Sequence, residues 1–239
     1  MKLSVVVPAF NEERLLPATL GHLHGGLDVA ARRGWSSELI VCDNNSTDRT
    51  SEIARLAGAR VVFEPVNQIS RARNAGASAA SGDWLLFVDA DSSPSRELVE
   101  DVLDAIESGR CVGGGCTVTL PLAPLGVRAW VAAWNLTSRT MRWAAGSFVF
   151  CEAAAFRAVG GFSEELYAAE EIDFSRRIKA RFPGRDFIIL HRHPLATSGR
   201  KVELYSAREQ LAFTWKMLTA GRRTLRSREA CSMWYDGRR

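Results

Sequence analysis

Short apolar runs alternate with helical patterns along the first half of the chain, and this alternation limits the fold more than any other feature. The runs are rich in Val, Ile and Leu, as in strands that are buried on both faces. Strands joined to helices by short links favour a parallel sheet covered by helices on both sides. The predicted strands are 3–8, 38–43, 60–64 and 84–91, and the predicted helices are 11–23, 46–58, 70–82 and 93–109.

The pattern changes after residue 110, where glycine-rich and tryptophan-rich segments follow. A strand is expected in 111–120 and a helix in 168–182, with no repeat or linker between the two halves. A chain of 239 residues with 46% hydrophobic content is long enough for one well-packed domain. We therefore predict a single α/β domain over residues 1–220, built on a Rossmann-like, mostly parallel central sheet that the second half extends.

The net charge of +4 resides in the C-terminal segment, where residues 220–239 hold six Arg against one Glu and one Asp. A basic tail over 221–239 can lie free in solvent or touch an anionic surface. We expect a peripheral membrane contact as an option and no nucleic-acid partner.

Five scattered cysteines, with no C-x-x-C pair, do not suit a disulfide framework or a zinc site. The N-terminal apolar run is too short for a signal peptide, and no apolar stretch is long enough to span a membrane. These features predict a cytoplasmic protein.

The loop after the first strand contains no glycine. It reads PAFNEERLL, so it is neither the G-x-G-x-x-G turn of a dinucleotide fold nor a P-loop. Glu12 and Glu13 would repel a pyrophosphate at the start of the following helix, for which Asn11 is the expected N-cap. The loop therefore excludes the two commonest phosphate-binding designs.

Carboxylates follow the second and fourth strands, at the edge where parallel sheets bind ligands. Asp43 can accept hydrogen bonds from a base or a ribose, or it can shape a turn. Asp89 and Asp91 point the same way if the strand continues through them, and they would repel each other unless a cation lies between them. Their hard oxygen ligands suit Mg²⁺ or Mn²⁺. A helix cap is the alternative for Asp91.

Taken together, these motifs resemble glycosyltransferase family 2, whose enzymes have the GT-A fold. The resemblance covers roughly residues 1–200. It rests on an ordered set of motifs, which are VVVPAFNEE, IVCDNNSTDRT, SRARNAG, LLFVDADS, AVGGF and EEIDFSRRIK.

The resemblance implies a UDP- or GDP-sugar donor and a divalent metal, Mn²⁺ or Mg²⁺. Residues 1–110 would form the nucleotide-binding half and 111–220 the acceptor-binding half. Asp91 would bind the metal, with Asp89 as a second ligand that also reaches the ribose or sugar. The donor-binding residues implied are Pro8, Phe10, Glu12, Asp43, Arg73, Asn74 and Asp89.

The family's catalytic Glu-Asp pair falls on Glu170 and Glu171, so that a Glu stands where Asp is expected. Inverting transfer needs a base that faces the acceptor hydroxyl, which could belong to a carbohydrate, a lipid-linked sugar or a small molecule. The first turn of a helix favours an ionised carboxylate. Which of the two residues is the base stays open.

Two further features have alternative explanations. His193, or His191, would be a third metal ligand or else a structural residue, and Arg200 would pair with the donor diphosphate. Tryptophans in 128–143 pack in the core, stack on an acceptor sugar, or meet a membrane beside Arg128, Arg139 and Arg142.

Other enzyme classes fit less well. A dehalogenase-type phosphatase carries its D-x-D on the first strand, and a nucleotidyltransferase needs a glycine-rich loop there. A non-catalytic sugar-nucleotide binder of the same fold is the remaining alternative.

Overall fold

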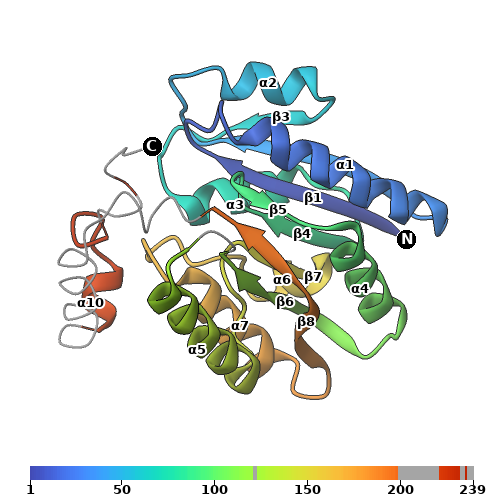
Figure 1. The fold of residues 1–239 in the computed structure, drawn as a ribbon, viewed down its shortest axis with the longest axis vertical. Coiled ribbons are helices and arrows are strands. Elements are labelled where there is room, and N and C mark those ends of the chain that lie inside the picture. Colours follow the sequence, from blue (N-terminus) through green and yellow to red (C-terminus); the bar gives the residue numbers. More distant parts are fainter. Residues whose placement is uncertain (121–122, 199–220, 232–234, 236–239) are drawn as a thin grey trace.

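The computed structural model describes residues 1–120, 123–198, 221–231 and 235. Its strands form one sheet in the order β3-β2-β1-β4-β7-β6-β8-β5 (Figure 1). The strands are β1 (Lys2–Ala9), β2 (Ser36–Asp43), β3 (Arg60–Phe63), β4 (Trp84–Val88), β5 (Ser92–Ser93), β6 (Cys111–Thr119), β7 (Phe148–Glu152) and β8 (Asp186–Thr197). The helices are α1 (Leu16–Arg32), α2 (Thr50–Leu56), α3 (Ile69–Ala79), α4 (Arg96–Glu107), α5 (Leu125–Met141), α6 (Ala153–Ala158), α7 (Glu170–Arg181) and α10 (Arg222–Leu225).

The first half builds a parallel block in which β1 lies between β2 and β4, and β3 pairs with β2. The second half extends the same sheet, because β7 pairs antiparallel with both β4 and β6. β8 then runs parallel to β6, and the short β5 closes the edge. The predicted α/β fold with a mostly parallel sheet is confirmed.

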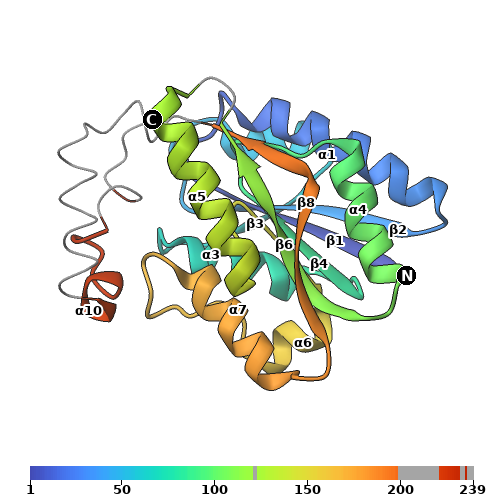
Figure 2. The same ribbon diagram turned by 60° about the horizontal axis from the view of Figure 1, so that its bottom comes forward.

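Helices cover both faces of the sheet, as Figure 2 shows, with α1 and α4 on one side and α3, α6 and α7 on the other. Alternate residues of β1 supply the two cores. Val5 and Val7 pack with Leu20 of α1, whereas Val6 packs with Phe87 and Phe174 on the opposite face. A strand buried on both faces favours apolar residues at consecutive positions, which explains the unbroken VVV run.

Several predicted boundaries differ from the structure, and two of the differences bear on the site. Helix α1 begins at Leu16, because Asn11 adopts a left-handed φ of 52° and its Oδ1 accepts a hydrogen bond from the backbone N of Thr47 (2.7 Å). Strand β4 ends at Val88, and the next residues form a turn in which Ser92 N donates to Asp89 O (3.1 Å). Asp89 and Asp91 therefore lie beyond the strand, and the argument from its alternation does not apply to them.

The glycines of β6 let neighbouring backbone come close. A Cβ added to Gly114 would lie 2.2 Å from the carbonyl oxygen of Ile188 in β8. A Cβ on Gly115 would lie 3.0 Å from Cα of Ala144, in the loop that leads to β7. The triple glycine thus permits tight packing on both sides of β6.

We expect Gly114→Ala to lower the free energy of unfolding by about 1–3 kcal/mol, because the obstacle is backbone that cannot rotate away. Chemical denaturation measures this change. The matched control is Gly21→Ala in α1, where an added Cβ meets no atom within 4 Å. That variant should gain about 0.5–1 kcal/mol from helix propensity, and equal effects would contradict the steric explanation.

In the part of the chain that the structure describes, no helix is both long and apolar enough to cross a membrane.

Candidate active site

Two loops form a common rim at the carboxyl ends of β1 and β2. The backbone N of Asn11 donates to Ser46 Oγ (3.0 Å), and the backbone N of Glu12 donates to Thr50 Oγ1 (2.8 Å). Glu13 N donates in the same way to Asp48 Oδ2 (3.1 Å). The glycine-free loop is therefore held by side chains of the second loop, and its backbone N–H groups are engaged there.

Four of the predicted donor-binding residues belong to this rim, and one of them is the buried Glu12. Pro8 is buried in β1 beside Cys42, and the half-buried Phe10 follows directly after the strand. Asp43 ends β2, where its Oδ1 accepts from the backbone N of Ser46 (2.9 Å) and its Oδ2 accepts from Ser51 Oγ. Asp43 thus shapes the turn that follows β2, which was the alternative reading of this residue.

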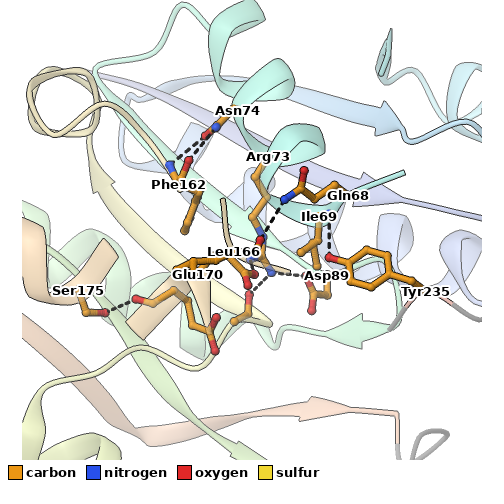
Figure 3. Close-up of polar contacts among 12 residues, drawn as sticks. Gln68, Ile69, Arg73, Asn74, Asp89, Phe162, Leu166, Glu170, Ser175 and Tyr235 are labelled. Carbon is orange, nitrogen blue, oxygen red and sulfur yellow. Dashed lines mark hydrogen bonds and ion pairs between the residues drawn. The ribbon is translucent and has the colours of Figure 1, made fainter. Parts of the chain in front are cut away.

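Arg73 lies at the centre of the site and comes from α3 (Figure 3). Its side chain is only 1% exposed. One amino group donates to Glu170 Oε1 (2.6 Å), and the other donates to Asp89 Oδ1 (2.9 Å) and to the carbonyl of Gly146 (2.6 Å). Burial alone would lower the pKa of Arg73, but the neighbouring carboxylates raise it above its ordinary value. The cation therefore binds three protein segments together, and its contact with a nucleotide stays a prediction.

Asn74 also makes its contacts within the protein. Its Oδ1 accepts from the backbone N of Phe162, and its Nδ2 donates to the carbonyl of the same residue (both 2.9 Å). The Asn74 side-chain amide thus bonds to both backbone groups of Phe162, as a neighbouring strand would do, and it fixes the segment before α7. Gln68 does the same further along, since its Nε2 donates to the carbonyls of Glu164 and Leu166 (2.7 and 3.0 Å).

Asp89 and Asp91 occupy the turn after β4. Asp89 is 27% exposed at its side chain and is held by Arg73. Asp91 Oδ2 accepts from Ser198 Oγ, at the end of β8. Carboxylate oxygens are the ligands that Mg²⁺ and Mn²⁺ prefer, and such ions are commonly held by one or two carboxylates plus substrate phosphates. The donor set at this turn fits such an ion.

Glu170 and Glu171 open α7, and the structure makes them unequal. Glu170 is 4% exposed and engaged by Arg73. Glu171 is half-buried, and its carboxyl faces Gly146, where an added Cβ would lie 3.3 Å from Cδ. Desolvation, and then the charge of Glu170, raise the pKa of Glu171 to about 8 although Arg73 opposes the shift. The expectation that the helix dipole keeps Glu171 ionised is therefore wrong.

The residue before the pair is strained. Ala169 adopts a left-handed φ of 59°, a conformation that costs a residue with a Cβ about 1 kcal/mol or more. Strained backbone of this kind is concentrated at functional sites. Neither Ala169 nor Gly146 was among the residues predicted from sequence, because ordinary small residues in a loop carry no local signal of such roles.

His193 lies away from the two aspartates. Its Nδ1 is 3.0 Å from Asp101 Oδ2 of α4, and His191 lines a hollow of about 560 Å³ between α4 and β8. Among the residues that the structure places, no group of three His, Cys, Asp or Glu side chains is arranged to hold a metal. The structure thus does not bring His193 to the Asp89–Asp91 turn. Arg200 lies outside the described residues.

Part of the C-terminal segment packs beside the site. Leu225 accepts a hydrogen bond at its carbonyl from Tyr167 N (2.7 Å), and Arg226 pairs with Glu165 (2.6 Å). Tyr235 stacks edge-on against Tyr167, and its hydroxyl lies 3.5 Å from the backbone N of Ile69. These described residues contact the loop that leads to α7, so they do not behave as a free tail.

The match to a protein family identifies the family of this chain. A family model for glycosyl transferase family 2 matches residues 4–157, which is more than half of the chain. The chain belongs to glycosyltransferase family 2. The predicted resemblance is confirmed, and the predicted enzyme class, a glycosyltransferase, agrees with the family that matches. The rim, the Asp89–Asp91 turn and Arg73 all lie within the matched region.

Relatives of this family-2 chain include an uncharacterized glycosyltransferase of Haemophilus influenzae, which is 29% identical over 189 residues. That alignment covers 72% of this chain and 60% of the relative. The chain spans about a third of the length of other curated relatives that it matches.

Two solved structures share the fold. One is the mannosyltransferase PcManGT from Pyrobaculum calidifontis in complex with GDP-Man and Mn²⁺. It has a TM-score of 0.67 at 17% identity, and the match covers 96% of this chain and 64% of that chain. The other is glucosyl-3-phosphoglycerate synthase from Mycobacterium tuberculosis in complex with Mn²⁺, UDP and glucosyl-3-phosphoglycerate. It has a TM-score of 0.63 at 23% identity, and the match covers 90% of this chain and 78% of that chain.

Removing the central cation should destabilise the whole site. Arg73→Met leaves Glu170 buried without its partner, and we expect a loss of about 3–5 kcal/mol in the free energy of unfolding. Denaturant titration measures it. Arg71→Met on the same helix is the control, because Arg71 forms only a partly exposed pair with Glu164 (3.0 Å) and should cost less than about 1 kcal/mol. Similar losses in both variants would contradict the central role of Arg73.

The raised pKa of Glu171 predicts a pH dependence of stability. Between pH 4.5 and about 8 the unfolded chain has lost this proton while the folded protein keeps it, so stability should fall as the pH rises through this window. Glu171→Gln removes this contribution and should therefore stabilise the protein more at pH 8 than at pH 5. Melting temperatures at the two pH values measure the difference, with Glu229→Gln at an exposed position as the control.

Proposed function

We propose that this protein transfers a sugar from a nucleotide-diphosphate donor to an acceptor hydroxyl, with inversion at the sugar carbon and with a divalent metal. The single observation that carries the proposal is the cluster around Arg73, which joins Asp89 to the Glu170–Glu171 pair. It brings the turn that suits a metal-bound diphosphate next to Glu171, a carboxylate whose pKa is raised to about 8. The two structural neighbours with bound Mn²⁺ and nucleotide support it.

The donor would lie along the rim of residues 8–12 and Asp43, at the carboxyl ends of β1 and β2. Residues 1–110 would bind its UDP or GDP group, and 111–220 would hold the acceptor. Asp91, with Asp89 beside it, would hold Mn²⁺ or Mg²⁺. The ion, when bound, offsets the charge that grows on the departing diphosphate.

Glu171 is the base in this proposal, and Glu170 is a positioning residue. Glu170 is buried and occupied by Arg73, so it has little freedom to accept a proton from an acceptor. Glu171 is more accessible, and a pKa of about 8 suits a group that must take up a proton near neutral pH. Arg73 and Asn74 would act on the reaction only by holding α7 and the Asp89 turn in place.

The test compares binding with turnover. Asp91→Ala should abolish the metal-dependent part of UDP or GDP binding, measured by calorimetry with and without Mn²⁺. Glu171→Gln should bind nucleotide as the wild type does while sugar transfer falls by roughly 10²–10⁴-fold. Asp104→Ala, a surface carboxylate paired with Arg33, is the control for both.

The donor is found first with a thermal-shift panel of nucleotide sugars and Mn²⁺. Transfer by Glu171→Gln at the wild-type rate would exclude Glu171 as the base. Tight nucleotide binding by the wild type without any turnover, with or without EDTA, would favour the non-catalytic binder.

A further inference from the structure

Helix α5 is attached to the domain along a narrow inner side. Over its length only Val131 and Ser138 are buried, and the helix packs on β6 and β8. Asn135 anchors it, because its amide donates to the carbonyl of Val118 (2.8 Å) and accepts from the backbone N of the same residue (3.0 Å). Both ribbon views show α5 at the outside of the molecule, beside α7 (Figures 1 and 2). Most of its circumference therefore faces outward.

The outward side of α5 is apolar. Leu125 is 81% exposed and Leu136 is 66% exposed, and the small side chains of Ala129 and Ala132 lie between them at helical spacing. Trp130 is 69% exposed, so it lies at the surface and not in the core. Its position in the sequence places it on a different side of α5 from the two leucines. Scattered exposed apolar residues are ordinary, but several on one face of one helix mark a contact surface.

The charged side chains of the segment that contains α5 have one sign. The sequence contains no Asp or Glu between Glu107 and Glu152. Arg128 and Arg139 lie eleven residues apart, which places them on one flank of the apolar stripe three turns from each other. The surface is thus apolar in the middle and positive at its side, without a compensating acid from its own segment.

We propose that the outer face of α5 binds an anionic membrane surface. A helix with an apolar side and flanking arginines lies in the plane of the lipid headgroups, where the apolar side chains enter the acyl boundary and the guanidinium groups meet phosphates. Tryptophan is enriched at this depth. The positive flank complements anionic lipids, which is why we choose lipid and not an apolar protein partner.

A membrane-bound α5 would also bear on the acceptor, a consequence that rests on the proposed function. The loop after α5 runs directly to Gly146, whose carbonyl accepts from Arg73 beside Glu171. A surface held by α5 would therefore bring membrane lipids close to the proposed base, so a lipid-linked acceptor is the class that fits best.

The test is flotation of the whole chain with vesicles of phosphatidylcholine alone or mixed with phosphatidylglycerol. Binding should require phosphatidylglycerol and weaken with salt. The double variants Leu125→Ser/Leu136→Ser and Arg128→Gln/Arg139→Gln should each reduce partitioning by about tenfold or more. The matched controls are Leu56→Ser/Phe63→Ser and Arg49→Gln/Arg55→Gln, which change exposed residues of the α2–β3 region and should bind as the wild type does.

Three results would overturn the proposal. The wild type could fail to bind anionic vesicles, or the α5 variants could bind as well as the controls, in which case another basic segment is responsible. Light scattering could also show a dimer that Leu125→Ser/Leu136→Ser dissociates, which would mean that a second copy covers α5. Vesicle binding is measured without nucleotide sugar, so its outcome is independent of whether the transferase proposal holds, and unchanged melting temperatures show that the variants are folded.

Discussion

The buried guanidinium of Arg73 is the interaction on which the rest of the site depends. A charge with 1% exposure must be matched by partners inside the protein, and here the partners come from three separate segments. Asp89 follows β4, Gly146 precedes β7, and Glu170 opens α7. Since the parallel first half supplies α3 and β4 and the second half supplies the other two segments, this one cation joins the two halves at the place where chemistry is proposed.

The same charges explain why two adjacent glutamates differ. Glu170 faces Arg73 directly and serves as its counter-ion. Glu171 is desolvated and lies next to an anion that is already paired, so its pKa rises to about 8. The field of the helix N-terminus, which alone would favour the ionised form, is too small to offset burial and a neighbouring carboxylate. The strained Ala169 and the close Gly146 then place the Glu171 carboxyl, and the packing of the described C-terminal residues against the preceding loop supports that arrangement.

The second half also gives the protein a different kind of surface. The glycines of β6 allow its neighbours to pack tightly, whereas α5, which follows, is left with an apolar outer side. Of the three explanations for the tryptophan-rich segment, core packing fails for Trp130, while Trp143 is partly covered and lies against Arg176 (4.5 Å from the guanidinium carbon to the ring centre). A short loop joins the end of α5 to Gly146, whose carbonyl accepts a hydrogen bond from Arg73.

The sequence by itself determined the α/β class and the family. The alternation of apolar runs with helical patterns is a local property, and the motifs that follow the strands occur in a fixed order along the chain. The sequence also singled out Asp89, Asp91, Glu170 and Glu171 as candidate site residues. Only the tertiary structure decided which partners they have. Arg73 and Asn74 hold other segments of the chain, and His193 pairs with Asp101. Arg73 donates to Glu170, and Glu171 is the glutamate with the raised pKa. Such roles depend on burial and on partners distant in the chain, and these are set by packing that local sequence does not encode.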